Sequence, residues 1–302
     1  MTPVVARAPA KVNAHLAVGP LRPDGFHELR TVYLAVSLYD TVTVQAADAL
    51  SVSVTGIDAD VVPTDRSNLV WRAAELLAEH AGVRADAAIG IDKSIPAAAG
   101  LAGGSADAAA ALVALDALWG TRASRGDLAA LAARLGSDVP FSLLGGVALG
   151  AGRGEQVSPV LARTRSHWAL GIAGDGLSTP AVYAELDRLR AAGALPDDGE
   201  LTSADPVMAA LRSGPPSALA GALANDLQAP ALALRPELGR ALRAATDAGA
   251  LAALVSGSGP TVAALAHDEQ GAIRLAAELA GAGVFRTVRA VHGPGPGARL
   301  VS

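Results

Sequence analysis

The chain has 302 residues, of which 51% are hydrophobic and 18% charged, with a formal net charge of −5. This composition predicts a folded protein of two closely joined domains, because single hydrophobic cores stop growing near about 250 to 300 residues. The acidic balance and the lack of a basic stripe argue against nucleic-acid binding. Zero cysteines exclude disulfides and cysteine-ligated zinc. With no secretory-type apolar stretch at residues 1–13, these features favour a cytoplasmic protein.

The first half of the chain alternates short β-branched stretches with turn residues and then becomes helical. Antiparallel strands are predicted at 11–18, 31–37, 41–45 and 51–55. Asn68 is a predicted N-cap of a helix that ends at Gly82. A strand precedes a glycine-rich loop, and a helix follows it at 105–118. Ser124 and Asp127 have the spacing of a capping box for the next helix.

A domain boundary is predicted near residue 160, which divides the chain into residues 1–160 and 161–302. The second half alternates strands and helices, so the sequence predicts an α+β fold. Its predicted elements are strands at 168–173 and 284–291 and helices at about 179–192, 216–224, 236–248 and 268–281. A polar loop is expected through Asp205, and the tail at 293–297 is expected to be loose. The uncharged stretch 248–266 contains Ser-Gly-Ser-Gly-Pro, which indicates two strands around a turn and no membrane span.

The glycine-rich loop lies between a predicted strand and a predicted helix, where small residues let backbone amides approach a phosphate. Its members are Pro96, Ala97, Ala98, Ala99, Gly100, Leu101, Ala102, Gly103, Gly104, Ser105 and Ala106. It lacks the lysine of a Walker A loop and the glycine spacing of a dinucleotide fingerprint. Taken alone, the loop is also compatible with tight packing of a helix on a sheet. The Ser105 hydroxyl is a candidate metal ligand.

Residues 96–108 resemble the P-x-x-x-G-L-x-G-G-S signature of the GHMP kinases, a superfamily that includes homoserine and mevalonate kinases. Further blocks at 8–13, 22–29, 135–141 and 256–261 are similar in order and spacing to one branch of the superfamily. That branch phosphorylates the 2-hydroxyl of 4-diphosphocytidyl-2-C-methyl-D-erythritol with ATP, in the non-mevalonate isoprenoid pathway. The resemblance also implies a ribosomal protein S5 domain 2-like N-terminal domain and a ferredoxin-like C-terminal domain.

The resemblance implies catalytic roles for two residues. Asp138 is implied to be the base that takes the proton from the substrate hydroxyl, and Lys11 to hold that carboxylate and the developing charge. Without the resemblance, the residues themselves favour a helix N-cap for Asp138 and a solvated strand lysine for Lys11. Asn13 lies two positions from Lys11 on a predicted strand, so both side chains point to the same face and Asn13 can contact the acceptor.

Three residues resemble the cytidine pocket of the branch. The rings of Phe26 and Tyr183 are implied to sandwich the base while His27 contacts its polar edge. Phe26 departs from the tyrosine common in relatives, and Tyr183 is also compatible with a core position. Ala98, Ala99 and Ala102 replace glycines common in relatives, and a position that needs positive φ would weaken ATP binding.

Mg²⁺ is expected because it bridges ATP phosphates in such transfers. The implied partner is a small-molecule substrate, and the sequence does not indicate an oligomeric state. Three alternatives remain at this point: another GHMP kinase of the homoserine or mevalonate type, a non-catalytic ATP-binding sensor, and a purely structural α+β domain. The block at 22–29 disfavours the first alternative, the retention of Lys11 and Asp138 disfavours the second, and the ordered blocks together disfavour the third.

Overall fold

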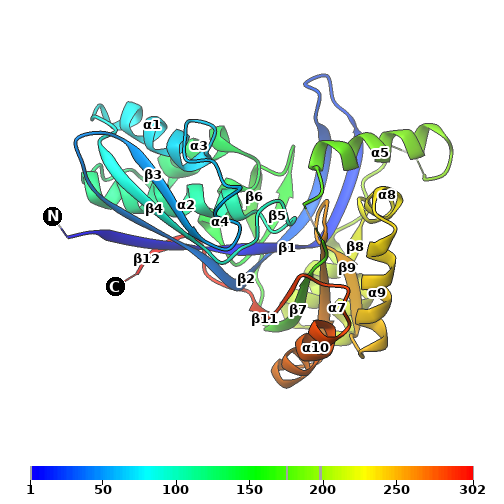
Figure 1. The fold of residues 1–302 in the computed structure, drawn as a ribbon. Coiled ribbons are helices and arrows are strands. Elements are labelled where there is room, and N and C mark those ends of the chain that lie inside the picture. Colours follow the sequence, from blue (N-terminus) through cyan, green and yellow to red (C-terminus); the bar gives the residue numbers. More distant parts are fainter. Residues whose placement is uncertain (1, 175, 197–198, 302) are drawn as a thin grey trace.

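The computed structural model describes residues 2–174, 176–196 and 199–301. Two long antiparallel strands, β1 (Val4–Leu21) and β2 (His27–Ala46), run through much of the molecule (Figure 1). The sequence predicted shorter separate strands here, which was wrong. Register shifts, including those at Pro9/Ala10 and Asn13/His15, absorb the interruptions without ending the pairing.

These strands form the centre of the first sheet, in the order β12-β1-β2-β4-β3. β5 pairs with β2, β6 with β5, and β8 runs parallel to β1. The bounds are β3 Ser51–Gly56, β4 Ala87–Lys93, β5 Val147–Ala151, β6 Gln156–Pro159, β8 Ala224–Asn225 and β12 Arg299–Leu300.

Four of the described helices lie on the side of the molecule that holds the first sheet (Figure 1). They are α1 (Leu69–Ala81), α2 (Gly103–Trp119), α3 (Arg125–Leu135) and α4 (Val139–Leu144). The alanine-rich α2 is buried along most of its length and packs on β1 and β2, because small side chains allow a close approach. The predicted caps are confirmed, since Asn68 accepts the Val70 amide at 2.8 Å and Ser124 and Asp127 form a capping box.

The second sheet is antiparallel throughout, in the order β11 (Thr287–Gly293), β7 (Ser166–Ile172), β10 (Thr261–Ala266) and β9 (Ala252–Val255). The helices of this half are α5 Thr179–Ala191, α6 Asp205–Ser213, α7 Pro216–Ala222, α8 Gln228–Leu234, α9 Glu237–Asp247 and α10 Glu269–Gly281. The described residues between α5 and α6 form no helix or strand, as the predicted polar loop requires, but α6, which begins at Asp205 and buries Val207 and Leu211, was not predicted. The α+β architecture is confirmed.

The predicted loose tail was also wrong. The Gly295 amide donates to the Ala35 carbonyl at 2.8 Å, and β12 pairs with β1. Residues near the end of the chain therefore complete the first sheet. The boundary near residue 160 falls in the connection between β6 and β7 and stays a prediction. Within the described ranges, no helix is long and apolar enough to cross a membrane.

Candidate active site

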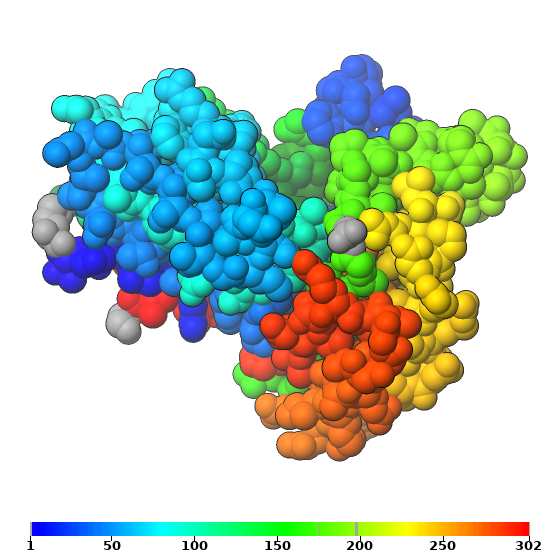
Figure 2. All heavy atoms as spheres, in the orientation of Figure 1, coloured from blue at the N-terminus to red at the C-terminus, as the bar shows by residue number. Residues whose placement is uncertain are grey.

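A cavity of about 900 Å³ opens where β1, β2, α5 and the turn between β9 and β10 meet the glycine-rich loop. Figure 2 shows the surface hollowed between the α1 side of the molecule, in cyan, and the α5 side, in light green. Of the predicted site residues, the following line the cavity: Lys11, Asn13, Phe26, His27, Ala98, Ala99, Gly100, Ala102, Gly103, Gly104, Ser105, Asp138 and Tyr183. The structure therefore brings together groups that lie up to 172 positions apart in the chain.

The glycine-rich loop is held by main-chain contacts from both sheets. The Lys11 amide donates to the Leu101 carbonyl at 3.1 Å, and the Thr261 amide to the Ala99 carbonyl at 3.4 Å. Gly100 has φ 74°, and a side chain there would collide with the carbonyl oxygens of the turn between β9 and β10. The turn and the loop therefore lie in direct contact. The first amides of α2 have no partner within the helix and lie at the cavity wall, where they can bind an anion.

Two alanines of this loop adopt a backbone conformation that favours glycine. Ala98 has φ 50° and Ala102 has φ 60°, whereas Ala99 is not among the residues with positive φ. The methyl group makes this left-handed region unfavourable by about 1 to 2 kcal/mol per residue. The loop therefore carries local backbone strain at two of the three positions where relatives were expected to have glycine.

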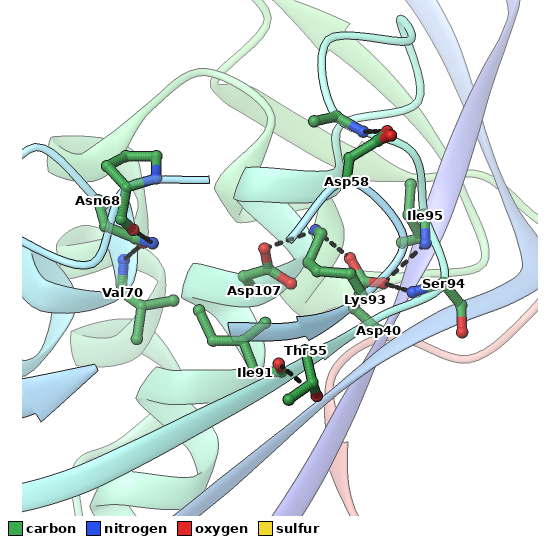
Figure 3. Close-up of polar contacts among 12 residues, drawn as sticks. Asp40, Thr55, Asp58, Asn68, Val70, Ile91, Lys93, Ser94, Ile95 and Asp107 are labelled. Atoms are coloured by element: carbon green, nitrogen blue, oxygen red, sulfur yellow. Dashed lines mark hydrogen bonds and ion pairs between the residues drawn. The ribbon is translucent and has the colours of Figure 1, made fainter. Parts of the chain in front are cut away.

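A buried charge cluster lies beneath the loop (Figure 3). The Lys93 ammonium donates to the carboxylates of Asp40 and Asp107, the latter at 2.7 Å. Asp40 also accepts the amides of Ser94 and Ile95, at 2.6 and 2.8 Å. Because Ser94 and Ile95 enter the loop and Asp107 lies in the helix that leaves it, the cluster ties the two ends of the loop together. A Cβ on Gly103 would lie 3.1 Å from Lys93 Nζ, so the ammonium sits directly under the start of α2.

The charge states of this cluster follow from its burial. Burial raises the pKa of Asp107 well above its usual range, the nearby Asp40 charge adds to the rise, and Lys93 opposes it. Burial acts to lower the pKa of Lys93, but the two carboxylates outweigh it and the pKa is raised. One buried cation thus faces two carboxyl groups, and Asp107 Oδ1 has no hydrogen-bond partner.

An ion pair holds the loop from the side of the second sheet. Asp58 Oδ2 accepts the Ala97 amide at 3.0 Å, a contact visible in Figure 3. The same carboxylate pairs with Arg286, which precedes β11, at 2.7 and 2.9 Å. The entry to the loop is therefore linked to both halves of the chain.

Lys11 and Asp138 face each other in the cavity, with Lys11 Nζ 4.0 Å from Asp138 Oδ2. Lys11 Nζ donates to Asn13 Oδ1 at 2.5 Å, and Asn13 in turn donates to the Thr31 hydroxyl at 2.8 Å. The Tyr33 hydroxyl donates to Asp138 Oδ1 at 3.0 Å. One carboxylate oxygen is thus fixed by Tyr33, and the other lies on the side of Lys11.

Burial determines the electrostatics of this pair. It lowers the pKa of Lys11, while the charge of Asp138 opposes that shift. Burial and the Asp138 charge together raise the pKa of Tyr33 well above its usual range, so its hydroxyl stays a proton donor. The Asp138 side chain is 30% exposed and keeps contact with the cavity.

Asp138 occupies the N-cap position of α4, but its side chain accepts no hydrogen bond from the helix. Its side chain therefore does not act as a helix cap. Lys11 is not a solvated strand lysine either, since its side chain is only 7% exposed. Both side chains are positioned for contact with a molecule in the cavity.

The mouth of the cavity carries the aromatic residues. The His27 and Tyr183 rings stack with centroids 5.1 Å apart, and His27 Nε2 lies 2.8 Å from Asp187 Oδ1. Phe26 is 48% exposed, and the Arg153 guanidinium lies over its ring, 4.7 Å from the centroid. In this structure Tyr183 thus faces His27, while Phe26 faces Arg153.

Pro96, Ala97, Leu101 and Ala106 of the predicted loop do not line the main cavity. Sequence reasoning also missed three residues of the site: Tyr33, Arg153 and Asp187 all line the cavity. Tyr33 is one of only three tyrosines, and Arg153 stands between two glycines at a turn. These two features could have drawn attention to Tyr33 and Arg153 in the sequence. Which side chains they contact is visible only in the folded structure.

Two family models match the chain. The GHMP kinases N terminal domain matches residues 68–146, and the GHMP kinases C terminal model matches residues 207–284. The glycine-rich loop and the Asp138 region lie within the first match, and the turn between β9 and β10 lies within the second. Fold and site therefore define the class of protein as a GHMP kinase.

Full-length relatives narrow the class. The chain is 60% identical over 300 residues to the 4-diphosphocytidyl-2-C-methyl-D-erythritol kinase of Rhodococcus jostii (strain RHA1), covering 99% of this chain and 96% of the relative. It is 58% identical over 299 residues to the kinase of the same name from Mycobacterium tuberculosis (strain ATCC 25618 / H37Rv), covering 99% and 93%. A crystal structure of 4-(cytidine 5'-diphospho)-2C-methyl-D-erythritol kinase matches with a TM-score of 0.78 and 35% identity, covering 96% of this chain and 100% of that one. The chain therefore belongs to the 4-diphosphocytidyl-2-C-methyl-D-erythritol kinase family of the GHMP kinases.

The resemblance found in the sequence and the predicted GHMP kinase fold are thus confirmed. Membership of this kinase family implies ATP as the co-substrate and a small molecule as the acceptor. The reaction class is phosphoryl transfer to an alcohol.

Proposed function

We infer that the protein transfers the γ-phosphoryl group of ATP to the 2-hydroxyl of 4-diphosphocytidyl-2-C-methyl-D-erythritol, a step of the non-mevalonate isoprenoid pathway. The observation that carries this inference is the open Lys11 and Asp138 pair, 4.0 Å apart, in the same cavity as the amides of the glycine-rich loop. The full-length identity to kinases of that name supports the choice of acceptor.

In the proposed mechanism, Asp138 accepts the proton of the substrate hydroxyl as the oxygen attacks the γ-phosphorus. The bond between that phosphorus and the β,γ-bridging oxygen breaks, and ADP leaves. Tyr33 fixes one oxygen of the carboxylate and thereby orients the other toward the acceptor. Lys11, held by Asn13, stabilises the carboxylate and the negative charge that develops on the transferred group.

We propose that the glycine-rich loop binds the ATP phosphates through the first amides of α2. The amides and the helix dipole favour an anion at this point. The buried Lys93 under Gly103 adds a positive charge behind the same amides. Within residues 96–106, those that line the cavity would contact the phosphates, and the buried ones would keep the loop backbone in position.

Magnesium is proposed to enter with ATP. No group of three His, Asp or Glu side chains in the described residues forms a ready-made metal site. The Ser105 hydroxyl at the loop end of the cavity suits Mg²⁺, which keeps several waters and binds phosphate oxygens with few protein ligands. Ser105 is therefore the candidate protein ligand, and the ion would neutralise phosphate charge.

The aromatic mouth is proposed to bind the cytosine. Phe26 is 48% exposed and supplies an aromatic ring for stacking, and His27 and Tyr183 line the same cavity. Stacking on an aromatic ring contributes about 1 to 3 kcal/mol per base in other proteins. The cytoplasmic location stays a prediction.

The direct test uses purified protein with MgATP and 4-diphosphocytidyl-2-C-methyl-D-erythritol. We expect ADP release only when this acceptor is present, and ³¹P NMR should show a new phosphate ester at the 2-position. Homoserine and mevalonate serve as controls. Equal turnover with either control would assign another GHMP kinase activity. ATP binding without turnover of any acceptor would identify a non-catalytic sensor.

A further inference from the structure

We propose that Arg153 binds the diphosphate of the nucleotide substrate and makes the cavity selective for nucleoside diphosphates over uncharged nucleosides. The proposal rests on the function inferred above and adds a residue to it. Its starting point is the charge of the cavity wall, where, in the described part of the chain, Lys11 and Arg153 are the lysine and arginine side chains.

The two cations differ in their surroundings. Lys11 is buried and already faces Asp138 and Asn13. The Arg153 side chain is 36% exposed, and its Nε lies at the long distance of 4.0 Å from Glu155. Asp138 and Asp187 contribute two negative charges to the wall, so a diphosphate in the cavity needs a positive partner. Arg153 is the cation placed to supply one.

Hydrogen bonds of the turn backbone fix the place of Arg153 in the fold. It occupies the turn between β5 and β6, flanked by Gly152 with φ 67° and Gly154 with φ 100°. The Gly152 amide donates to Glu28 at 3.1 Å, and the Arg153 amide donates to Glu155 at 2.7 Å. The turn is therefore fixed to the start of β2, where His27 directly follows Phe26.

The same turn adjoins the reacting end of the cavity. A side chain at Gly154 would collide with the Tyr33 hydroxyl, which holds Asp138. The turn of residues 152–154 thus contacts the ring of Phe26 through Arg153 and adjoins the acceptor side of the cavity through Gly154. In the substrate, the diphosphate also lies between the cytosine and the alcohol that is phosphorylated, so the order of groups on the wall matches the order of groups in the ligand.

The present contact of Arg153 with the Phe26 ring is compatible with this role. A cation over an aromatic ring at a partly exposed site is a weak interaction, whereas a guanidinium can donate two parallel hydrogen bonds to phosphate oxygens. The diphosphate can therefore draw the guanidinium from the ring, which frees that face of Phe26 for the base. Arginine suits this exchange better than lysine, because its planar fork binds phosphate in a bidentate manner.

The test compares the binding of cytidine and CDP, in the presence of saturating ADP so that the phosphate loop is occupied. In wild-type protein we expect CDP to bind more tightly than cytidine. Arg153→Gln should weaken CDP binding about 10- to 100-fold while cytidine affinity stays the same or rises. Arg153→Lys should recover part of the loss. The matched control is Arg188→Gln on α5, where the arginine pairs with Glu185 and is absent from the cavity wall, and it should change neither affinity.

An equal loss for cytidine and CDP would overturn the proposal, because it would mean that Arg153 only supports the Phe26 ring. Unchanged CDP affinity in Arg153→Gln would overturn it as well. A parallel turnover assay separates this failure from that of the proposed function. If wild-type protein phosphorylates 4-diphosphocytidyl-2-C-methyl-D-erythritol and Arg153→Gln keeps the same KM, only the role of Arg153 is wrong.

Discussion

Two clusters of lysine and aspartate side chains adjoin the glycine-rich loop. They differ in how far their charged groups are buried and paired with one another. In the cluster of Lys93, Asp40 and Asp107, the lysine touches two carboxylates, and all three side chains are at most 3% exposed. In the cavity, Lys11 stays 4.0 Å from Asp138, whose side chain is 30% exposed. The first cluster is closed around itself and holds the loop. The second keeps one carboxylate oxygen open, which is what proton transfer to a bound ligand requires.

The largest effect is expected at the open cluster. Asp138→Asn keeps the shape of the side chain but removes the base, so kcat should fall by about 10² to 10⁴-fold. The free energy of unfolding and the affinity for ADP should change little, because Asp138 caps no helix amide. ADP release and an ADP titration measure the two quantities. If Asp138→Asn also lost much of its unfolding free energy, Asp138 would belong with the structural cluster instead.

The closed cluster should show the opposite pattern. Asp40→Asn puts an amide donor among the Ser94 and Ile95 amides and the Lys93 ammonium, so the unfolding free energy should fall by about 3 to 5 kcal/mol. Urea denaturation checks this. The matched variant Asp107→Asn should cost about 1 kcal/mol or less, since Asp107 accepts from Lys93 through one oxygen only. Equal losses in the two variants would contradict the unequal roles of these carboxylates.

The pH dependence sharpens the same contrast. The pKa of Asp107 in the folded state is raised above its usual 3.8. The contribution of the Asp107 carboxyl to the unfolding free energy is therefore complete below pH 3.8 and is lost as pH rises through the folded-state pKa. The amide introduced by Asp107→Asn has no proton to lose over this range. The stability of this variant relative to wild type should therefore increase as pH is raised from about 4 toward 7. Urea midpoints of both proteins across this range measure the difference, and a constant difference would contradict the raised pKa.

The sequence predicted what depends on local chemistry. Asn68 and Ser124 were identifiable as caps because their hydrogen bonds reach only two or three residues along the chain. The closed cluster was not predicted, because Asp40 and Lys93 are 53 positions apart and only strand pairing brings them together. Tyr33 and Asp138, 105 positions apart, were missed as a pair for the same reason.

Long-range pairing also explains the errors in the fold. Bulges in β1 and β2 conceal the continuity of two long strands, since each interruption resembles a turn in the sequence. The glycine and proline tail was expected to be loose from its composition. Its order depends on Ala35 and β1, which lie more than 250 positions away in the chain.

The smallest expected effect concerns the strained alanines, which the sequence identified as departures without revealing their φ angles. Ala102→Gly should leave the unfolding free energy unchanged or raise it by up to about 1 kcal/mol. Glycine tolerates φ 60°, and the strain that is removed offsets the larger loss of chain entropy that glycine undergoes on folding. Ala109→Gly, in the buried interior of α2, is the comparison at a helical φ and should cost more than about 1 kcal/mol, because it loses helix propensity and a buried methyl group. Thermal or urea unfolding of the two variants gives the comparison. If both substitutions destabilise equally, the left-handed conformation at Ala102 carries no strain, and the methyl group there is as well accommodated as one inside the helix.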